Sequence, residues 1–139
     1  MKRMLPAVLA IALTLGGVAS AQIDPTDTGA GDKVGMQELN NSGQIGSVTL
    51  FGHGATTSVV IAIDGVPGGK VQAATIHRGK DCDTVDPKAV VRLTDLKGGR
   101  GRTIVKMPES RLMSDNYSVL VYANTNPNAH AVSCGHLYH

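Results

Sequence analysis

From Gln44 onward the chain alternates short apolar runs with clusters of turn residues, roughly every ten positions. In the run ending at Asp64, the residues Val59, Ile61 and Ile63 follow a period of two, which is typical of a strand with one buried face. The pattern predicts seven strands, over residues 44–51, 58–64, 70–78, 89–93, 102–107, 117–123 and 131–137. Short strands between regular turns, without a convincing helical segment, predict an all-β fold, an antiparallel sandwich or barrel.

The same alternation assigns side chains to the two faces of the predicted strands. Thr75 and His77 alternate with the apolar residues Ala74 and Ile76, so they point to the opposite side. Tyr122 ends a run of alternating valines and points away from the core in the same way. We therefore expect Thr75, His77 and Tyr122 to form one patch on the outer surface.

The N-terminal segment has the three parts of a secretory signal peptide. Lys2 and Arg3 precede an apolar run over residues 4–18, and Ala19-Ser20-Ala21 forms a small-residue cleavage site. Residues 1–21 are therefore expected to be removed on export, leaving no membrane span and a secreted or periplasmic product. Residues 22–43 are rich in Gly, Asp, Thr and Asn and predict a flexible linker, followed by a single domain over residues 44–139.

The charge balance of the exported part argues against an anionic partner. Removing Lys2 and Arg3 takes two of the 13 basic side chains and leaves 11 against 11 acidic ones. A neutral chain gives no sign of binding to nucleic acid or to an anionic membrane. The segment Gly98-Gly99-Arg100-Gly101-Arg102 lacks neighbouring aromatic residues for base stacking, and a hairpin turn explains its glycines.

Cys82 and Cys134 are the two cysteines of the chain. In an oxidising compartment an exported chain with two cysteines favours one disulfide. Such a bridge stabilises by about 4 kcal/mol in the chain-entropy model, less any strain. Free thiols or metal thiolates are the alternatives.

Four segments, taken in order, resemble the copper/zinc superoxide dismutases and their smaller exported, CHRD-like relatives. The segments are GQIGSVTLFGHGATTSVVIAIDGVPGG, AATIHRGKDC, SDNYSVLVYAN and AVSCGHL, and they span most of residues 43–137. The resemblance implies an eight-stranded Greek-key sandwich with a disulfide between Cys82 and Cys134.

The departures from the family pattern fall on its metal ligands. Thr75 and His77 stand at the positions that resemble the two histidines of the family's H-x-H pair, so one of the two is replaced by threonine. Tyr122 stands where the resemblance implies a third copper histidine. The chain has no histidine between His77 and His130, where the family supplies its bridging and zinc ligands. Because redox copper needs several imidazoles in fixed geometry, we expect neither a cofactor nor catalysis.

These observations leave two hypotheses for the function. The favoured one is an exported, non-catalytic, dismutase-like domain that binds an unknown protein or envelope partner or has a structural role there. The alternative is a divergent copper- or zinc-binding protein or dismutase that uses His77 with the C-terminal histidines His130 and His136. The spacing of these histidines matches no standard metal motif.

Overall fold

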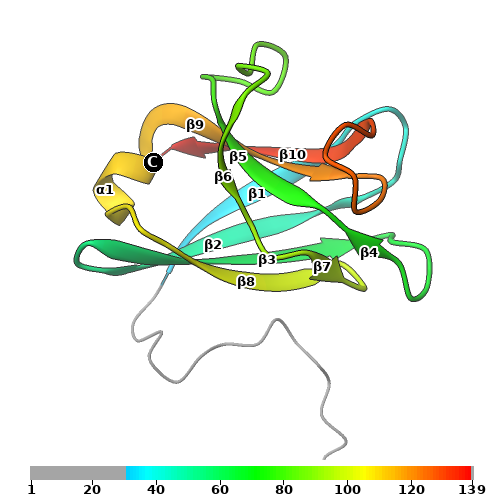
Figure 1. Ribbon diagram of the computed structural model, residues 1–139, viewed down its shortest axis with the longest axis horizontal. Helices are drawn as coiled ribbons and strands as arrows, with labels where there is room; N and C mark the ends of the chain where they lie inside the picture. The colour runs from blue at the N-terminus through cyan, green and yellow to red at the C-terminus, as the bar shows by residue number, and fades with distance from the viewer. Residues whose placement is uncertain (1–30, 139) are drawn as a thin grey trace, which may run out of the picture.

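The computed structural model describes residues 31–138, which form ten strands and one short helix (Figure 1). The elements are β1 (Asp32–Glu38), β2 (Ile45–His53), β3 (Thr56–Asp64), β4 (Val71–Gln72), β5 (Ala74–Arg78), β6 (Ala89–Arg92), β7 (Leu96–Lys97), β8 (Arg100–Val105), α1 (Glu109–Leu112), β9 (Ser114–Tyr122) and β10 (Ala131–Tyr138). The prediction of an all-β fold is confirmed. The expected signal peptide, residues 1–21, lies outside the described residues.

All strand pairs are antiparallel, and they follow one continuous order, β4-β7-β8-β3-β2-β1-β10-β9-β5-β6. β1 pairs with β2 on one side and with β10 on the other, so it belongs to both layers of the fold. One layer contains β2, β3 and β8, and the facing layer contains β5, β9 and β10 (Figure 1). The result is a strongly curled antiparallel sheet that encloses a single main core.

The chain itself joins the two ends of this strand order. Only Ala73 separates β4 from β5, and residues 93–95 separate β6 from β7. The chain bends between β6 and β7, so that β6 pairs with the preceding strand β5 and β7 pairs with the following strand β8. β9 then returns to lie beside β5. This path is a Greek-key connection.

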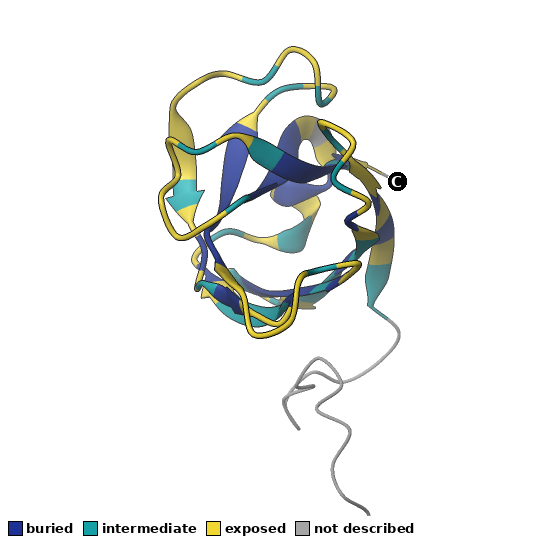
Figure 2. Cartoon of the chain, turned by 90° about the vertical axis from the view of Figure 1, so that its right-hand side faces the viewer, coloured by how far each residue is buried: buried dark blue, intermediate teal, exposed yellow. Residues whose placement is uncertain are grey.

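The core lies between the two layers and is built from aliphatic side chains at alternate strand positions. It includes Val48, Leu50, Val59, Ile61, Ile76, Val119 and Val121, each at most 1% exposed. Burial is concentrated along the strands, whereas the loops at the ends of the barrel are largely exposed (Figure 2). Each such side chain contributes roughly 1.5–3 kcal/mol when fully buried.

The glycine-rich segment at residues 98–102 makes a hairpin turn, as predicted. Gly98 and Gly99 have φ values of 57° and 80° and connect β7 to β8. Two successive residues with positive φ fit the right-handed twist of a two-residue hairpin, and glycine adopts them without steric cost.

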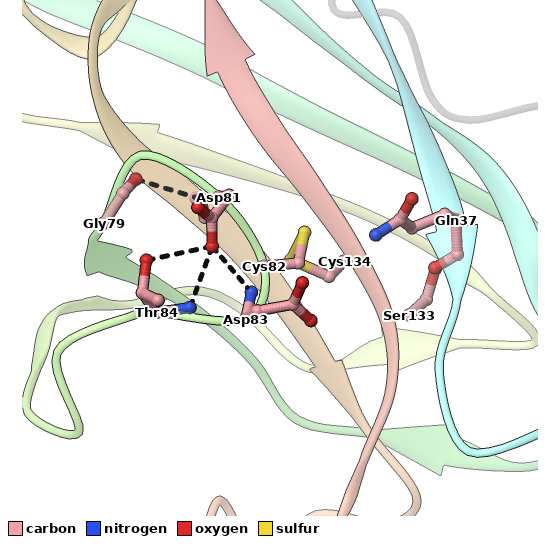
Figure 3. The surroundings of a disulfide bond; sticks show 9 residues. Gln37, Gly79, Asp81, Cys82, Asp83, Thr84, Ser133 and Cys134 are labelled. Atoms are coloured by element: carbon pink, nitrogen blue, oxygen red, sulfur yellow. Dashed lines mark hydrogen bonds between the residues drawn. A yellow bond between two sulfur atoms is a disulfide. The ribbon is translucent and has the colours of Figure 1, made fainter.

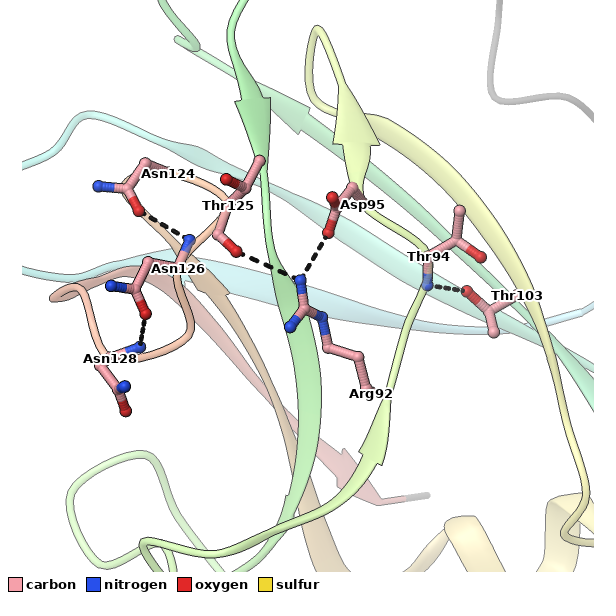
Figure 4. Close-up of polar contacts among 8 residues, drawn as sticks. All are labelled: Arg92, Thr94, Asp95, Thr103, Asn124, Thr125, Asn126 and Asn128. Atoms are coloured by element: carbon pink, nitrogen blue, oxygen red, sulfur yellow. Dashed lines mark hydrogen bonds and ion pairs between the residues drawn. The ribbon is translucent and has the colours of Figure 1, made fainter.

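The junction between β6 and β7 is held by polar contacts to neighbouring segments (Figure 4). The Arg92 guanidinium bonds to the Asp95 carboxylate at 3.0 Å and donates to the carbonyl of Thr125 at 3.2 Å. The backbone amide of Thr94 donates to Thr103 Oγ1 at 2.8 Å. These contacts join the bend to β8 and to the loop after β9, so we assign Arg92 a structural role.

The structure differs from the sequence prediction at the expected linker, residues 22–43, because Asp32–Glu38 forms strand β1. Val34 and Met36 point into the core and are 9% and 3% exposed. Asn40 and Asn41, with φ values of 55° and 54°, then turn the chain toward β2. Two apolar residues among polar ones give too weak a period to identify a strand from the sequence. The strand forms because β1 pairs with β2 and β10, which are distant in the sequence or separated from it by a turn. Helix α1 is a second feature that the pattern did not predict.

Candidate functional site

The loop of residues 79–88 crosses the outer face of β5, β9 and β10 and is attached there by a disulfide bond (Figure 3). Cys82 in this loop is bonded to Cys134 in β10, with 6.0 Å between their Cα atoms. The predicted pairing is therefore confirmed. Such a bond is compatible with an oxidising extracellular or periplasmic location.

The carboxylate of Asp81 organises the loop around the disulfide. Its Oδ1 atom accepts hydrogen bonds from the backbone amides of Asp83 and Thr84 and from the Thr84 hydroxyl, each at 2.9 Å. The Thr84 hydroxyl and these amides hold the pKa of the Asp81 carboxyl below its ordinary value of 3.8. Asp81 is therefore a positioned carboxylate at neutral pH.

Glycine at position 79 lets the loop leave β5 in close contact with its own far end. Gly79 has a φ of 156°, and a Cβ atom there would lie 2.7 Å from the Cα of Val85. Its amide donates to the carbonyl of Asn116, and its carbonyl accepts from Ser118 Oγ at 3.1 Å. These contacts fix the loop to β9 in addition to the disulfide.

Thr75, His77 and Tyr122 meet beneath this loop. Thr75 Oγ1 lies 3.0 Å from the Tyr122 hydroxyl, and His77 Nε2 lies 2.8 Å from Thr75 Oγ1 and 3.0 Å from the Tyr122 hydroxyl. The three side chains come from β5 and β9, which are adjacent strands. We call these three residues the Thr-His-Tyr cluster.

Both ring nitrogens of His77 are within hydrogen-bond distance of protein atoms. Nδ1 lies 2.6 Å from the carbonyl oxygen of Asp86, which can only accept, so Nδ1 carries the proton in this contact. In the neutral ring Nε2 is then the acceptor, and one of the two hydroxyls donates to it while the other donates to its neighbour. Every polar atom of the Thr-His-Tyr cluster is therefore satisfied within the protein.

The prediction that these residues share one face is confirmed, but their expected place on the surface is wrong. Thr75, His77 and Tyr122 are 2%, 5% and 6% exposed. Tyr122 belongs to a second, smaller apolar cluster. Its other buried members are Ala73, Leu120 and Cys134, and the partly buried Leu39, Cys82, Val85 and Ala131 pack against it. The loop of residues 79–88 supplies Cys82 and Val85 to this cover, which strand periodicity could not reveal.

The three histidines considered as metal ligands are not brought together. His77 in β5 and His136 in β10 both pair with Ser118 of β9, which lies between these two strands. The backbones of the two histidines are therefore two strand spacings apart, each spacing being about 4.8 Å. His130 is exposed and precedes β10, six residues before His136, or about 20 Å along a strand. Within residues 31–138 no group of three or more His, Cys, Asp or Glu side chains is placed to hold a metal ion.

The donor atoms beside His77 do not fit a copper or zinc centre. They are a threonine hydroxyl, a tyrosine phenol and a backbone carbonyl. Copper and zinc prefer imidazole and thiolate ligands, and the phenol must lose its proton before it binds strongly. We derive no chemistry through a metal at this position.

A shallow pocket of about 420 Å³ lies beside the disulfide, on the outer face of β1 and β10. It is lined by Val34, Gly35, Gln37, Asp81, Cys82, Cys134, His136 and Tyr138. We call it the cystine pocket. Sequence reasoning missed the β1 side of this pocket because the residues of β1 were expected to be part of a linker.

Comparisons with known proteins give no match. No protein-family model matches the chain, and searches of curated proteins and of solved structures find no match either. Among the described residues, no helix is both long enough and apolar enough to cross a membrane.

Proposed function

We propose that this chain is an exported, non-catalytic, dismutase-like domain that binds a protein or envelope partner. The observation that carries the proposal is the closed hydrogen bonding of His77. A catalytic copper ligand presents a nitrogen lone pair to the metal, whereas His77 Nε2 faces two hydroxyls at 2.8 and 3.0 Å beneath a covering loop.

The dismutase-like part of the proposal is supported by two independent features. The strands follow a Greek-key path in a curled antiparallel sheet. The Cys82–Cys134 bridge joins the two cysteines that resemble the family's pair. Thr75 and Tyr122 then stand at the positions that resemble two of the copper histidines, and they bond to His77 where the family would bind metal.

Export is supported by the signal-like N-terminal pattern and by the disulfide, which persists in an oxidising compartment. A neutral exported domain with a stapled loop and a fully bonded cluster has the properties of a rigid binding scaffold. Rigid scaffolds carry their recognition sites on loops and on outer sheet faces.

The test is metal loading of the oxidised chain, followed by exhaustive dialysis, metal analysis and a superoxide-removal assay. We expect sub-stoichiometric copper and zinc and no superoxide removal above that of free buffer. His77→Ala and His130→Ala should both retain the same trace metal as the unmodified chain. Stoichiometric copper that is lost with His77→Ala would instead establish the divergent metalloprotein, and its loss with His130→Ala as well would place His130 among the ligands.

A further inference from the structure

The cystine pocket combines a fixed negative charge with an exposed aromatic ring. Asp81 contributes a carboxylate from the loop, and Tyr138 at the end of β10 is 54% exposed. The Tyr138 and His136 rings lie against each other, with centroids 5.0 Å apart and planes tilted by 33°. Gln37 adds an amide from β1.

These groups are held on rigid backbone. All three hydrogen bonds to Asp81 end on Oδ1, so the carboxylate is oriented by its own loop. The adjacent Cys82 is covalently attached to β10 (Figure 3). Ser133 Oγ of β10 donates to the Gln37 carbonyl of β1 at 3.1 Å, which joins these two strands. A preorganised site loses less conformational entropy when a ligand binds.

Gly35 leaves space on the β1 side of the pocket. A Cβ atom built on Gly35 would meet no heavy atom within 4 Å, and the residue is exposed. A larger side chain at this position can therefore fill the pocket without distorting the backbone. The volume of about 420 Å³ lies at the low end of the roughly 300–1,000 Å³ typical of ligand sites, which suits one long side chain.

The charge of the pocket selects the sign of its occupant. Asp81 is the acidic residue among the lining residues, which include no lysine or arginine. His136 is the one lining residue that can carry a positive charge, and its attraction is a smaller cause of the lowered pKa of Asp81. Asp81 is ionised at neutral pH, because the ordinary pKa of 3.8 lies far below 7 and the Thr84 hydroxyl lowers the pKa of this carboxyl further. A carboxylate beside an exposed aromatic ring favours a cation that can bond to one and lie over the other.

We propose that the cystine pocket is the docking site for an arginine side chain of a partner protein. The guanidinium bonds to the Asp81 carboxylate and stacks on the Tyr138 ring, and the aliphatic stem passes over Gly35. Arginine fits better than lysine because its guanidinium is planar and weakly hydrated. It can stack on an aromatic ring and donate two hydrogen bonds to a carboxylate, whereas an ammonium group is a compact, strongly hydrated charge. The inference rests on the proposed partner-binding function and names the chemistry of the partner.

The test is an NMR titration of the oxidised, isotope-labelled chain with the blocked tripeptide acetyl-Gly-Arg-Gly-amide. Two comparison peptides replace arginine by lysine or by citrulline, which is neutral and of the same shape. We expect the backbone amides of Gln37, Cys82 and Tyr138 to shift with the arginine peptide, and about threefold or more weaker binding for citrulline. Equal binding of either comparison peptide, or no shift with arginine, would overturn the assignment.

Three variants locate the binding. Asp81→Asn keeps an oxygen acceptor for the loop but removes the charge, and Gly35→Leu fills the pocket; each should weaken arginine binding about threefold or more. Asp83→Asn is the matched control, since it removes a charge from the same exposed loop outside the lining, and should bind as the unmodified chain does. Arginine binding that is unchanged in Asp81→Asn would refute the site.

This outcome is independent of the metal-loading test. A chain that binds arginine and also holds stoichiometric copper would keep the docking site and lose the non-catalytic assignment. A chain that holds no metal and does not bind the arginine peptide would keep the non-catalytic assignment and lose the docking site.

Discussion

At the scale of single residues, the Thr-His-Tyr cluster is held together by hydrogen bonds among its own members. Three polar side chains buried together are tolerated because each one is the partner of another. A fully satisfied polar network favours a single arrangement, whereas the loss of one member leaves a buried group without a partner.

Tyr122→Phe should therefore destabilise the folded chain. The substitution removes one hydroxyl that lies 3.0 Å from both Thr75 Oγ1 and His77 Nε2, and keeps the ring in its apolar surroundings. We expect a loss of about 1 kcal/mol in the free energy of unfolding, measured by urea denaturation. Tyr138→Phe, at an exposed tyrosine, is the control and should change stability by much less. Equal effects of the two variants would contradict the buried network.

Asp81 should titrate below pH 3.8 in the folded chain, because hydrogen bonds from Thr84 and from two amides favour the charged carboxylate. A lowered folded-state pKa means that the contribution of these bonds is present above the ordinary pKa and is lost as the pH falls through the lower, folded value. Carboxyl NMR during acid titration measures the pKa directly, and the Asp83 and Thr84 amides should shift with it. A pKa at or above 3.8 would show that the loop bonds are not formed.

Alternation along the strands was sufficient to predict which face Thr75, His77 and Tyr122 share. It could not predict that they are buried, because their cover comes from residues 79–88, which have no period of their own. Gln37 and Gly35 of the cystine pocket were not predictable either, since two buried residues, Val34 and Met36, are too few to establish a strand.

At the scale of elements, the loop of residues 79–88 is a cover held by one covalent bond and several hydrogen bonds. The sequence predicted the cysteines and their pairing, but not that the loop folds back over the outer face of its own layer. That contact depends on Gly79, because a Cβ atom at this position would lie only 2.7 Å from the Val85 Cα atom.

Replacing both cysteines by serine should remove up to about 4 kcal/mol of stability in the chain-entropy model. The loop should also open locally, because Cys82 packs with Val85 and Leu120 in the outer cluster. We expect a lower denaturation midpoint and faster hydrogen exchange at residues 79–88 than in the rest of the fold. The unmodified chain treated with reductant is the matched comparison. An unchanged midpoint would indicate that the bridge does not constrain the unfolded chain.

At the scale of the whole molecule, β1 is the strand that makes the two layers one sheet. It pairs with β2 over Asp32–Met36 and with β10 at Gln37 and Glu38. The strand runs predicted from the sequence were mostly correct in position. Their spatial order was not contained in them, because pairing between distant strands depends on contacts that no local period encodes, and only the family resemblance implied the Greek-key path.

A chain that begins at residue 44, the expected domain boundary, should fail to fold, whereas residues 22–139 should fold cooperatively. The shorter chain lacks Val34 and Met36, each worth roughly 1.5–3 kcal/mol when buried, together with the ladders to β2 and β10. That loss is a large part of a typical unfolding free energy of about 5–15 kcal/mol. Circular dichroism and thermal melting of both chains measure the difference. A cooperative transition in the shorter chain would mean that β1 is dispensable.

The central claim is that His77 is bonded to the protein and not available to a metal. It is tested most directly by long-range ¹⁵N NMR of the imidazoles while the oxidised chain is titrated with zinc. We predict a protonated Nδ1 and an acceptor Nε2 in His77, with neither signal changed by one equivalent of zinc, even if exposed His130 responds. A stoichiometric shift of His77 Nε2, accompanied by changes in the Tyr122 signals, would contradict the account.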